Sequence, residues 1–427
     1  MADPEISEAE QFIGDDDDFH SKNKDKPLYN MLTRKNLGMY LQFVFFGIGS
    51  VLPIFVIFAA VDYFDDIFPR KQPEFALNVI YNPLLFCGCF VNLVWGRAAS
   101  FKWRIVSGFS VMIVCMLGFI LLDQLELCGS TCLTSHYWSV LFVAGVLGLA
   151  DAVCQSTLFG LTTHALPPLY TQGLMLGVGL CGLLMTILRV LTKTTTKNLH
   201  ISSYYYFGTA AMFIVVVIAV YFRLSRGNAF QRYYSQAPRS GVDTDWKHPF
   251  QRFAFFTGEA LRVLRYKHVF CHCFLLTLVT AQQYVVIPSV ATMAIDFLGS
   301  GWFPVLLILV YNIGDVLGRG PLAMYYVYSL HWAWLSTLVR FFVVVGICLS
   351  VPPHVMSDRP AWMATFVAIL GLSTGHLSTS LISHASSEVP GRAKETVGYL
   401  SVLSMTLGMA GGSAASYCIK ALLDRTA

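Results

Sequence analysis

Eleven apolar stretches run along nearly the whole chain, and they constrain its fold more than any other feature. Each has about 20 residues or more, enough for a helix to cross about 30 Å of hydrocarbon. The alternation of apolar and polar residues that marks a membrane β-barrel is missing. We therefore expect an all-α polytopic membrane protein with about eleven transmembrane helices, at 37–63, 75–96, 103–123, 137–161, 168–192, 203–224, 266–295, 302–325, 331–352, 361–385 and 396–422.

The composition agrees with a membrane protein, because 55% of the 427 residues are hydrophobic and only 13% are charged. The expected partner is the lipid bilayer, and the formal net charge of +4 gives no reason to expect a nucleic acid polymer. Residues 1–36 form an acidic polar tail without a cleavable signal pattern, so we expect this tail to remain on the mature protein.

Lysine and arginine placement predicts the orientation. If the tail is cytosolic, 19 of the 29 basic residues lie on that side of the membrane and seven lie on the other, in line with the positive-inside rule. An odd number of spans then places the C-terminus outside. We expect the plasma membrane, with an internal membrane as the alternative.

One long polar segment, 225–264, divides the chain into a six-helix bundle at 37–224 and a five-helix bundle at 265–427. Its second half, "PFQRFAFFTGEALRVLRYK", mixes aromatic residues with arginines, as an interfacial helix on an anionic cytosolic leaflet would. A solvated linker is the alternative. Two bundles joined in this way are typical of secondary transporters with a site near the membrane midplane, although a layout alone does not establish function.

The eighth span carries buried charge in "YNIGDVLGRG", where Asn312, Asp315 and Arg319 are spaced to share one helix face. This span-eight stripe offers an amide, a carboxylate and a guanidinium, which suit a neutral ligand rich in hydroxyls and ring nitrogens. Alternatively, the two charges neutralise each other and only lock the fold. Gly314 and Gly318 lie on another side, where a neighbouring helix could approach closely.

The fourth span repeats this logic in "LGLADAVCQSTLFGL", where Asp151 and Gln155 are four residues apart. A glutamine donates and accepts hydrogen bonds at once, which suits the edge of a nucleobase. An interhelical hydrogen bond that only holds helices together is the alternative reading of this span-four pair.

These residues resemble the equilibrative nucleoside transporters. "NIGDVLGR" matches the N-x-x-D-x-x-x-R pattern of that family, and "CQSTLFGL" is similar to its fourth-helix Q-[GS]-[ST]-L-F-G-L stretch. Weaker similarities are "GIGSVLP", "AAVDYF", "RVLTK" and "LGLSTGHLSTSLI". The resemblance implies a major-facilitator-like 6+5 arrangement that moves nucleosides, and sometimes nucleobases, passively or with protons. It also implies that Gln155 contacts the base, while Asn312, Asp315 and Arg319 serve the ribose and couple it to closure.

Some positions depart from the family pattern. Where the first helix usually reads L-P-W-N, this chain reads "LPIF", so Ile54 replaces an aromatic wall of the substrate site and Phe55 replaces an amide. Span seven reads "TAQQYVVIPS" in place of a phenylalanine-proline pair, and span ten has Thr374 and His376 where asparagine and often tyrosine are expected. These changes indicate either an altered ligand or a divergent member with weak transport.

Further charged groups within spans suggest a gating network. Asp151 and Arg189 are candidates for an ion pair between spans four and five, and Arg340 is a candidate partner of Asp315. His376 is either a hydrogen-bonded packing residue or a proton relay, since imidazole exchanges protons near neutral pH.

The cysteines give little further chemistry. Cys128 and Cys132 fall in an expected exterior loop and could form a local disulfide, although a loop this short would stabilise the fold little. In "CHC", at 271–273, the side chains point to different helix faces, so neither a metal nor another cofactor is expected.

Other functions fit less well. The stretch "GLSTG", at 371–375, matches the G-x-S-x-G pattern of serine hydrolases, but that pattern requires a strand-turn-helix elbow and Ser373 is expected within a helix. We therefore expect no enzyme. A receptor or a channel would show seven spans or a repeated pore loop. A solute carrier for another small polar molecule, such as a sugar or a drug, is the main alternative.

Overall fold

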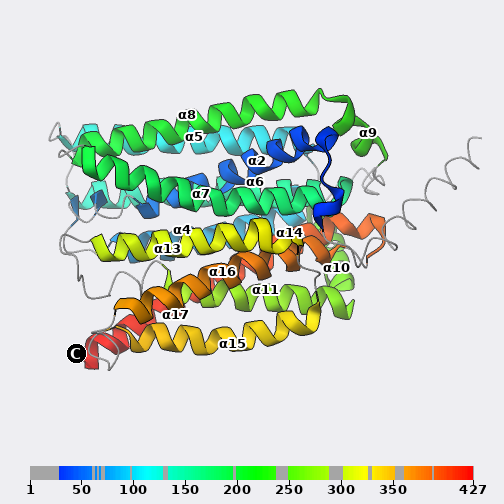
Figure 1. The fold of residues 1–427 in the computed structure, drawn as a ribbon. Coiled ribbons are helices and arrows are strands. Elements are labelled where there is room, and N and C mark those ends of the chain that lie inside the picture. The colour runs from blue at the N-terminus through cyan, green and yellow to red at the C-terminus, as the bar shows by residue number, and fades with distance from the viewer. Residues whose placement is uncertain are drawn as a thin grey trace, which may run out of the picture.

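The computed structural model describes residues 28–59, 63–64, 67–68, 73–96, 99–127, 133–195, 199–236, 249–287, 302–325, 329–351, 360–386 and 389–426. Within these ranges, eleven helices are long and apolar enough to cross a membrane. They lie side by side along one common direction (Figure 1). The prediction of eleven spans is therefore confirmed.

The first bundle contains six of these helices: α2 (Arg34–Ala59), α4 (Pro73–Val94), α5 (Phe101–Leu127), α6 (Leu133–Ala165), α7 (Pro168–Thr195) and α8 (Leu199–Ser225). The second bundle contains five: α11 (Lys267–Val286), α13 (Trp302–Leu317), α15 (Leu330–Leu349), α16 (Pro360–Ala385) and α17 (Lys394–Thr426). Several helices begin at a proline, which fits the first turn because its missing N–H would have no partner there.

Short elements lie before, between or directly after the long helices. They are η1 (Leu28–Met31), α9 (Asn228–Gln236), α10 (Pro249–Leu264), η3 (Gly318–Leu322), α14 (Ala323–Tyr325) and η4 (Gly391–Ala393). The segment between the bundles thus contains two helices, α9 and α10, at the same end of the molecule (Figure 1). The seventh span ends as a helix at Val286, and most of the remainder of its expected range lies outside the described residues.

The outer surface of the bundles is apolar. Large side chains that are well exposed on single spans include Trp103 (73%), Phe142 (73%) and Phe342 (78%). A water-soluble protein rarely exposes so much apolar area, so this surface fits a lipid environment.

The two bundles meet along two contacts. Helix α17 packs against α4 and α6 on one side, and α7 packs against α13, η3 and α16 on the other. The α17 contact is close because Gly398 of α17 lies against Gly160 of α6, where an added Cβ would come within 3.0 Å of the Gly160 Cα. We call the contact of α7 with α13 and η3 the inter-bundle seam.

Candidate functional site

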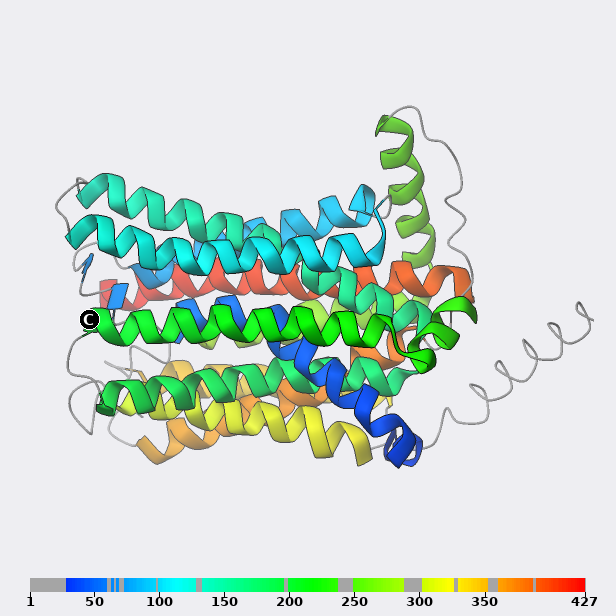
Figure 2. The same cartoon turned by 90° about the horizontal axis from the view of Figure 1, so that it is seen from above.

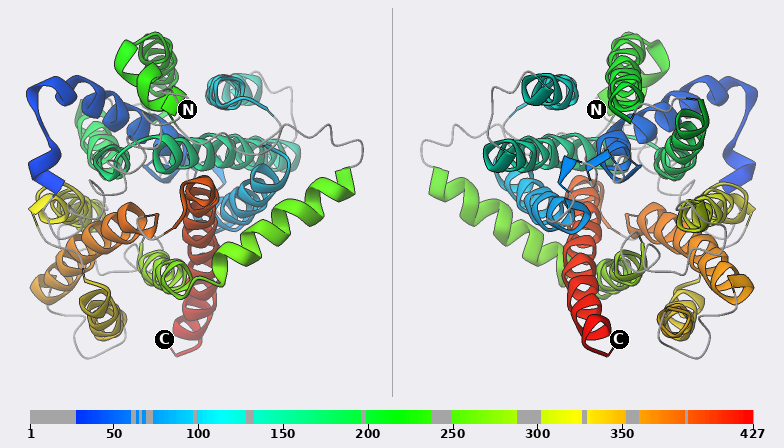
Figure 3. Two further views of the ribbon diagram at one scale, coloured as in Figure 1. Left: turned by 90° about the vertical axis from the view of Figure 1, so that its right-hand side faces the viewer. Right: turned by 90° about the vertical axis from the view of Figure 1, so that its left-hand side faces the viewer.

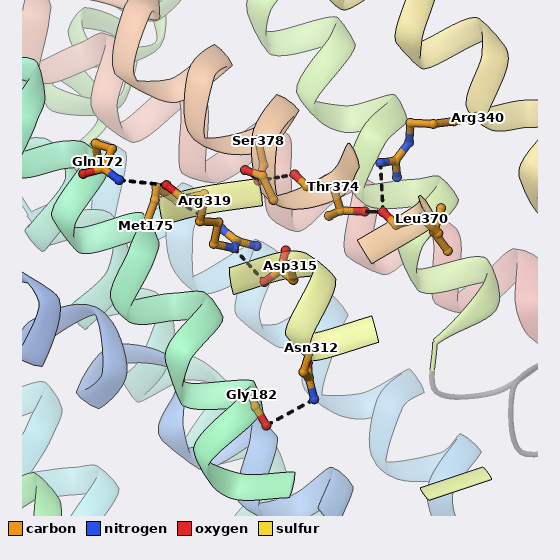
Figure 4. A network of polar contacts seen from close by, with 11 residues as sticks. Gln172, Met175, Gly182, Asn312, Asp315, Arg319, Arg340, Leu370, Thr374 and Ser378 are labelled. Carbon is orange, nitrogen blue, oxygen red and sulfur yellow. Dashed lines mark hydrogen bonds and ion pairs between the residues drawn. The ribbon is translucent and has the colours of Figure 1, made fainter. Parts of the chain in front are cut away.

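The span-eight stripe lies on the inter-bundle seam. Asn312 donates from Nδ2 to the Gly182 carbonyl oxygen at 3.1 Å and to Thr186 Oγ1 at 2.8 Å, both on α7. Arg319 donates from Nε to Asp315 Oδ2 at 2.7 Å, as Figure 4 shows. All three side chains are at least nine-tenths buried. The stripe therefore presents its amide and its ion pair to the opposite bundle.

Glycines in α7 make room for these side chains. A Cβ added at Gly179 would lie 2.7 Å from Arg319 Cδ and 3.0 Å from Asp315 Oδ2. A Cβ added at Gly182 would lie 2.7 Å from Asn312 Oδ1. A side chain at either position would displace the stripe residues, so these glycines let the α7 backbone approach the stripe closely.

The other side of α13 faces α16, as expected from the small residues there. A Cβ at Gly314 would lie 2.8 Å from the Ala368 carbonyl oxygen, and one at Gly318 would lie 2.7 Å from the backbone nitrogen of His376. Helices α13 and α16 thus pack backbone to backbone, which leaves the opposite face of α13 for the seam.

The eighth span is not a uniform α-helix, which the sequence expectation missed. Residues Gly318–Leu322 form a π-helical segment that contains Pro321. Proline has no N–H to donate, and insertions of this kind occur often at functional sites. The N–H of Ala323 bonds to the carbonyls of Gly318 and Gly320 rather than to that of Arg319. The Arg319 carbonyl therefore accepts from outside its own helix.

That carbonyl accepts a hydrogen bond across the seam. Gln172 of α7 donates from Nε2 to the Arg319 oxygen at 2.7 Å (Figure 4). Gln172 Oε1 in turn accepts from the Tyr40 hydroxyl of α2 at 2.9 Å. All three residues are buried. We call this chain the Tyr40–Gln172–Arg319 bridge. Sequence reasoning did not find it, although Pro321 directly after Gly320 signalled a freed carbonyl nearby.

The span-four pair makes its contacts inside its own bundle. Asp151 Oδ1 accepts from Gln155 Nε2 at 2.9 Å, and Asp151 Oδ2 accepts from the hydroxyl of Tyr81 on α4. Both members of the pair are almost fully buried. The carboxylate fixes the glutamine amide with its nitrogen toward Asp151, so the glutamine oxygen is turned away from it.

Several buried polar atoms have no hydrogen-bond partner among the residues that the structure describes. Two of them are acceptor oxygens on opposite bundles, namely Gln155 Oε1 in the first bundle and Asp315 Oδ1 in the second. Buried polar atoms without partners are uncommon and costly, at about 1–3 kcal/mol each. A ligand that brings hydrogen-bond donors would satisfy both.

Tyr284 of α11 is buried between the two groups. Its side chain lies near Asp151 of the span-four pair and near both Asp315 and Arg319 of the span-eight stripe. The charged groups of the two bundles therefore converge on one region of the membrane interior.

Arg340 is buried in α15 but does not contact Asp315. Its guanidinium donates to Gln282 Oε1 at 2.9 Å, to Ser373 Oγ at 2.9 Å and to the Val279 carbonyl at 3.1 Å. Figure 4 also shows its bond to the Leu370 carbonyl. Arg340 thus joins α11, α15 and α16 within the second bundle, and Asp315 pairs with Arg319 instead.

The remaining candidates lie elsewhere in the fold. Arg189 is buried in α7, but the Asp151 carboxylate contacts Tyr81 and Gln155 rather than Arg189. His376 is half-buried on α16. Ile54 is buried in α2, and the next residue, Phe55, lies against Gly182 of α7. The expected loop cysteines, Cys128 and Cys132, lie outside the described residues.

Two helical bundles with buried polar residues along their contact form the arrangement of the major-facilitator fold. Solved structures agree on this fold. An outward-facing bacterial homologue of the iron transporter ferroportin superposes with a TM-score of 0.57 at 12% identity, over 92% of this chain and 99% of that one. The Escherichia coli fucose:proton symporter superposes with a TM-score of 0.53 at 11% identity, over 92% and 98%.

The family follows from the sequence comparisons. The model of the nucleoside transporter family matches residues 141–421. The Arabidopsis thaliana equilibrative nucleotide transporter 1 is 26% identical over 88% of this chain and 84% of its own length. The human equilibrative nucleoside transporter 4 is 21% identical over 90% and 83%. The chain therefore belongs to the nucleoside transporter family.

Proposed function

We propose that this chain moves nucleosides, and nucleobases with lower affinity, across a membrane by alternating access. The observation that carries the proposal is the pair of unsatisfied acceptors, Gln155 Oε1 and Asp315 Oδ1, on opposite bundles. A nucleoside brings donors at both of its ends, namely amino or ring N–H groups on the base and hydroxyls on the ribose. The family and the relatives named above support this substrate class.

In this proposal the base lies against the first bundle and the ribose against the second. Gln155 Oε1 accepts from the base, while Asp151 holds the amide in the required orientation. Asp315 Oδ1 accepts from a ribose hydroxyl, while Arg319 neutralises the carboxylate through Oδ2. A substrate that contacts both bundles binds most tightly when the bundles are close together. Its binding therefore shifts the conformational equilibrium toward the closed state.

Movement of the bundles requires the inter-bundle seam to change. The bonds of Asn312 to α7 and the Tyr40–Gln172–Arg319 bridge both cross that seam. We propose that they hold the bundles in the observed conformation and break on one side during transport. Asn312, Arg319 and Gln172 would then act in the conformational cycle as well as near the substrate.

We propose facilitated movement rather than proton coupling. Asp315 and Arg319 form a pair of zero net charge, so a neutral nucleoside needs no co-transported proton to balance the site. Proton coupling through His376 is the outcome that would contradict this part of the proposal.

We also propose a plasma-membrane location with the N-terminus and the segment 225–264 in the cytosol and the C-terminus outside. The excess of lysine and arginine on that side supports this orientation. Impermeant thiol labelling of Cys128 and Cys132 after mild reduction, with protease access to 237–248 from each side, tests it. Cleavage of 237–248 from outside intact cells would overturn the topology.

A serine hydrolase lacks support at Ser373. That residue lies within helix α16, donates to the Ile369 carbonyl at 2.7 Å and accepts from Arg340. A nucleophile elbow requires a sharp turn between a strand and a helix. We propose that Ser373 helps to hold Arg340 and has no catalytic role, so a serine-reactive probe should not label it.

The experiment that tests the proposed function is uptake of a labelled panel in transport-deficient cells. The panel contains purine and pyrimidine nucleosides, nucleobases and a hexose, at two external pH values with and without a protonophore. We expect saturable nucleoside uptake that is insensitive to the protonophore. Uptake of the hexose without any nucleoside would overturn the substrate class, and loss of uptake with the protonophore would establish proton coupling.

A further inference from the structure

Helix α10 lies across the bundle rather than along it. In Figure 2 it runs across the direction of the spans, and in Figure 3 it projects beyond the outline of the bundle from beside α17. A helix with this direction at the end of transmembrane helices lies in the plane of the membrane surface.

The contacts of α10 with the ends of two spans indicate its position relative to the membrane. The ring of Phe253 packs against Phe90, inside the end of α4, and against Trp95 just beyond it, with ring centroids 6.4 and 6.1 Å apart. Thr396, in the first turn of α17, donates to Glu259 Oε1 at 2.6 Å. Because α4 ends and α17 begins at this level, α10 lies at the boundary between hydrocarbon and headgroups.

One side of α10 is attached to the protein. Phe256, Ala260 and Val263 are 2%, 6% and 3% exposed and fall on one stripe of the helix. They pack against the ends of spans from both bundles, since α10 contacts α4, α11 and α17. This attachment fixes which side of the helix points outward.

The apolar surface of α10 is wider than the part that the described protein covers. Ala254 and Leu261 extend the apolar stripe beyond the attached side, yet both are exposed, Leu261 by 58%. Arg262 and Arg265 are exposed on the side opposite the attached stripe, and Phe255 lies near Arg262 at 44% exposure. An apolar edge next to arginines and an aromatic ring is typical of a helix in the interface of an anionic membrane.

We propose that α10 binds anionic phospholipids of the adjacent leaflet. Leu261 and Ala254 lie in the acyl-chain region, and Arg262 and Arg265 contact lipid phosphates. The proposal is independent of the transported substrate, since it concerns a surface outside the central site. Because α10 touches α4 of one bundle and α17 of the other, lipids bound here contact the element that joins the two bundles.

The test compares two variants of equal charge loss in lipid nanodiscs and by native mass spectrometry. One is Arg262→Gln on α10 with Arg265→Gln directly after it. The control is Arg226→Gln with Arg232→Gln beside and within α9, where both arginines are also exposed. The measured quantities are the amount of bound phosphatidylglycerol and its apparent affinity, with phosphatidylcholine as the neutral lipid.

We expect the α10 variant to bind phosphatidylglycerol about tenfold more weakly or worse, since each arginine near an anionic surface contributes attraction, while the control changes about twofold or less. Leu261→Asp should weaken binding of both lipids at this surface. Equal losses in the two arginine variants would show a general charge effect and overturn the proposal. Unchanged binding in the α10 variant would overturn it as well.

Discussion

The span-four pair and the span-eight stripe have nearly the same chemistry but different surroundings. Each contains an acid with a polar partner four residues away. Asp151 and Gln155 bond only within the first bundle, whereas Asn312 and Arg319 reach across the seam to α7. The comparison teaches that the opposing helix decides the role. On the proposed mechanism, a group bonded within its own bundle stays fixed during transport, while a group bonded across the seam changes partners.

The largest expected effect is that of changing both charged residues of the span-eight stripe, which distinguishes a role in substrate binding from a role in folding. Asp315→Asn combined with Arg319→Gln should reach the membrane at near-normal levels, because both replacements keep volume and hydrogen-bonding capacity. It should transport less than about a tenth of the wild-type amount. Each single change leaves one buried charge unpaired, at a cost of about 3–5 kcal/mol, and should lower surface expression.

The measurement for these variants is uptake normalised to surface-labelled protein. Arg262→Gln on the membrane surface controls for loss of an arginine outside the site. Substantial uptake by the double variant would reduce the ion pair to a structural role and remove the stripe from substrate recognition.

The second prediction concerns the span-four pair. Gln155→Ala should weaken nucleoside affinity by about tenfold and change the ranking of purine over pyrimidine substrates, because it removes the acceptor proposed for the base. Expression should fall little, since Asp151 keeps its bond from Tyr81. Competition assays with unlabelled nucleosides measure the ranking. An unchanged ranking would show that Gln155 does not recognise the base.

The third prediction concerns the Tyr40–Gln172–Arg319 bridge. Gln172→Leu should shift the conformational equilibrium away from the observed state by about tenfold, because the buried hydrogen bond across the seam is lost together with the bond from Tyr40 that orients Gln172. Tyr40→Phe should shift it less, since one bond remains. Spin-label distances between position 226, directly after α8 of the first bundle, and position 266, directly before α11 of the second, report the shift. Tyr205→Phe on the exposed face of α8 is the control. Unchanged distances in Gln172→Leu would show that the bridge does not hold the bundles.

The smallest expected effect is that of Asn312→Ala. It removes neutral hydrogen bonds to Gly182 and Thr186, each of which contributes about 1 kcal/mol. Apparent affinity should weaken by a few-fold, while the maximal rate stays within about twofold. A loss of uptake as severe as that of the double charge variant would contradict this prediction. It would show that the Asn312 amide is essential to transport and does more than strengthen binding.

The fold could be predicted because membrane physics leaves few choices. Apolar length alone located the eleven spans, since backbone groups in hydrocarbon must bond within helices. The face shared by Asn312, Asp315 and Arg319 followed from helix geometry, and the glycines at 314 and 318 indicated the side of α13 that packs on another helix.

The partners of the polar residues could not be predicted in the same way. Arg340 was expected to need a carboxylate, but its donors are satisfied by Gln282, Ser373 and backbone carbonyls of other helices. Tyr81 and Gln172 are single polar residues without a local pattern, so only the packing of distant helices reveals their contacts. The π-helical segment depends on Pro321, whose effect on the neighbouring carbonyls needs a three-dimensional structure.

The central claim is that one nucleoside bridges Gln155 in the first bundle and Asp315 in the second. Equilibrium binding of a labelled nucleoside to purified protein in nanodiscs tests it most directly, with the wild type, Gln155→Ala, Asp315→Asn combined with Arg319→Gln, and all three changes together. Since the two groups contact opposite ends of the ligand, the losses in binding free energy should add. Saturable binding that weakens about tenfold in each variant and about a hundredfold in the combination is the predicted result. Wild-type affinity in the combined variant would contradict the claim.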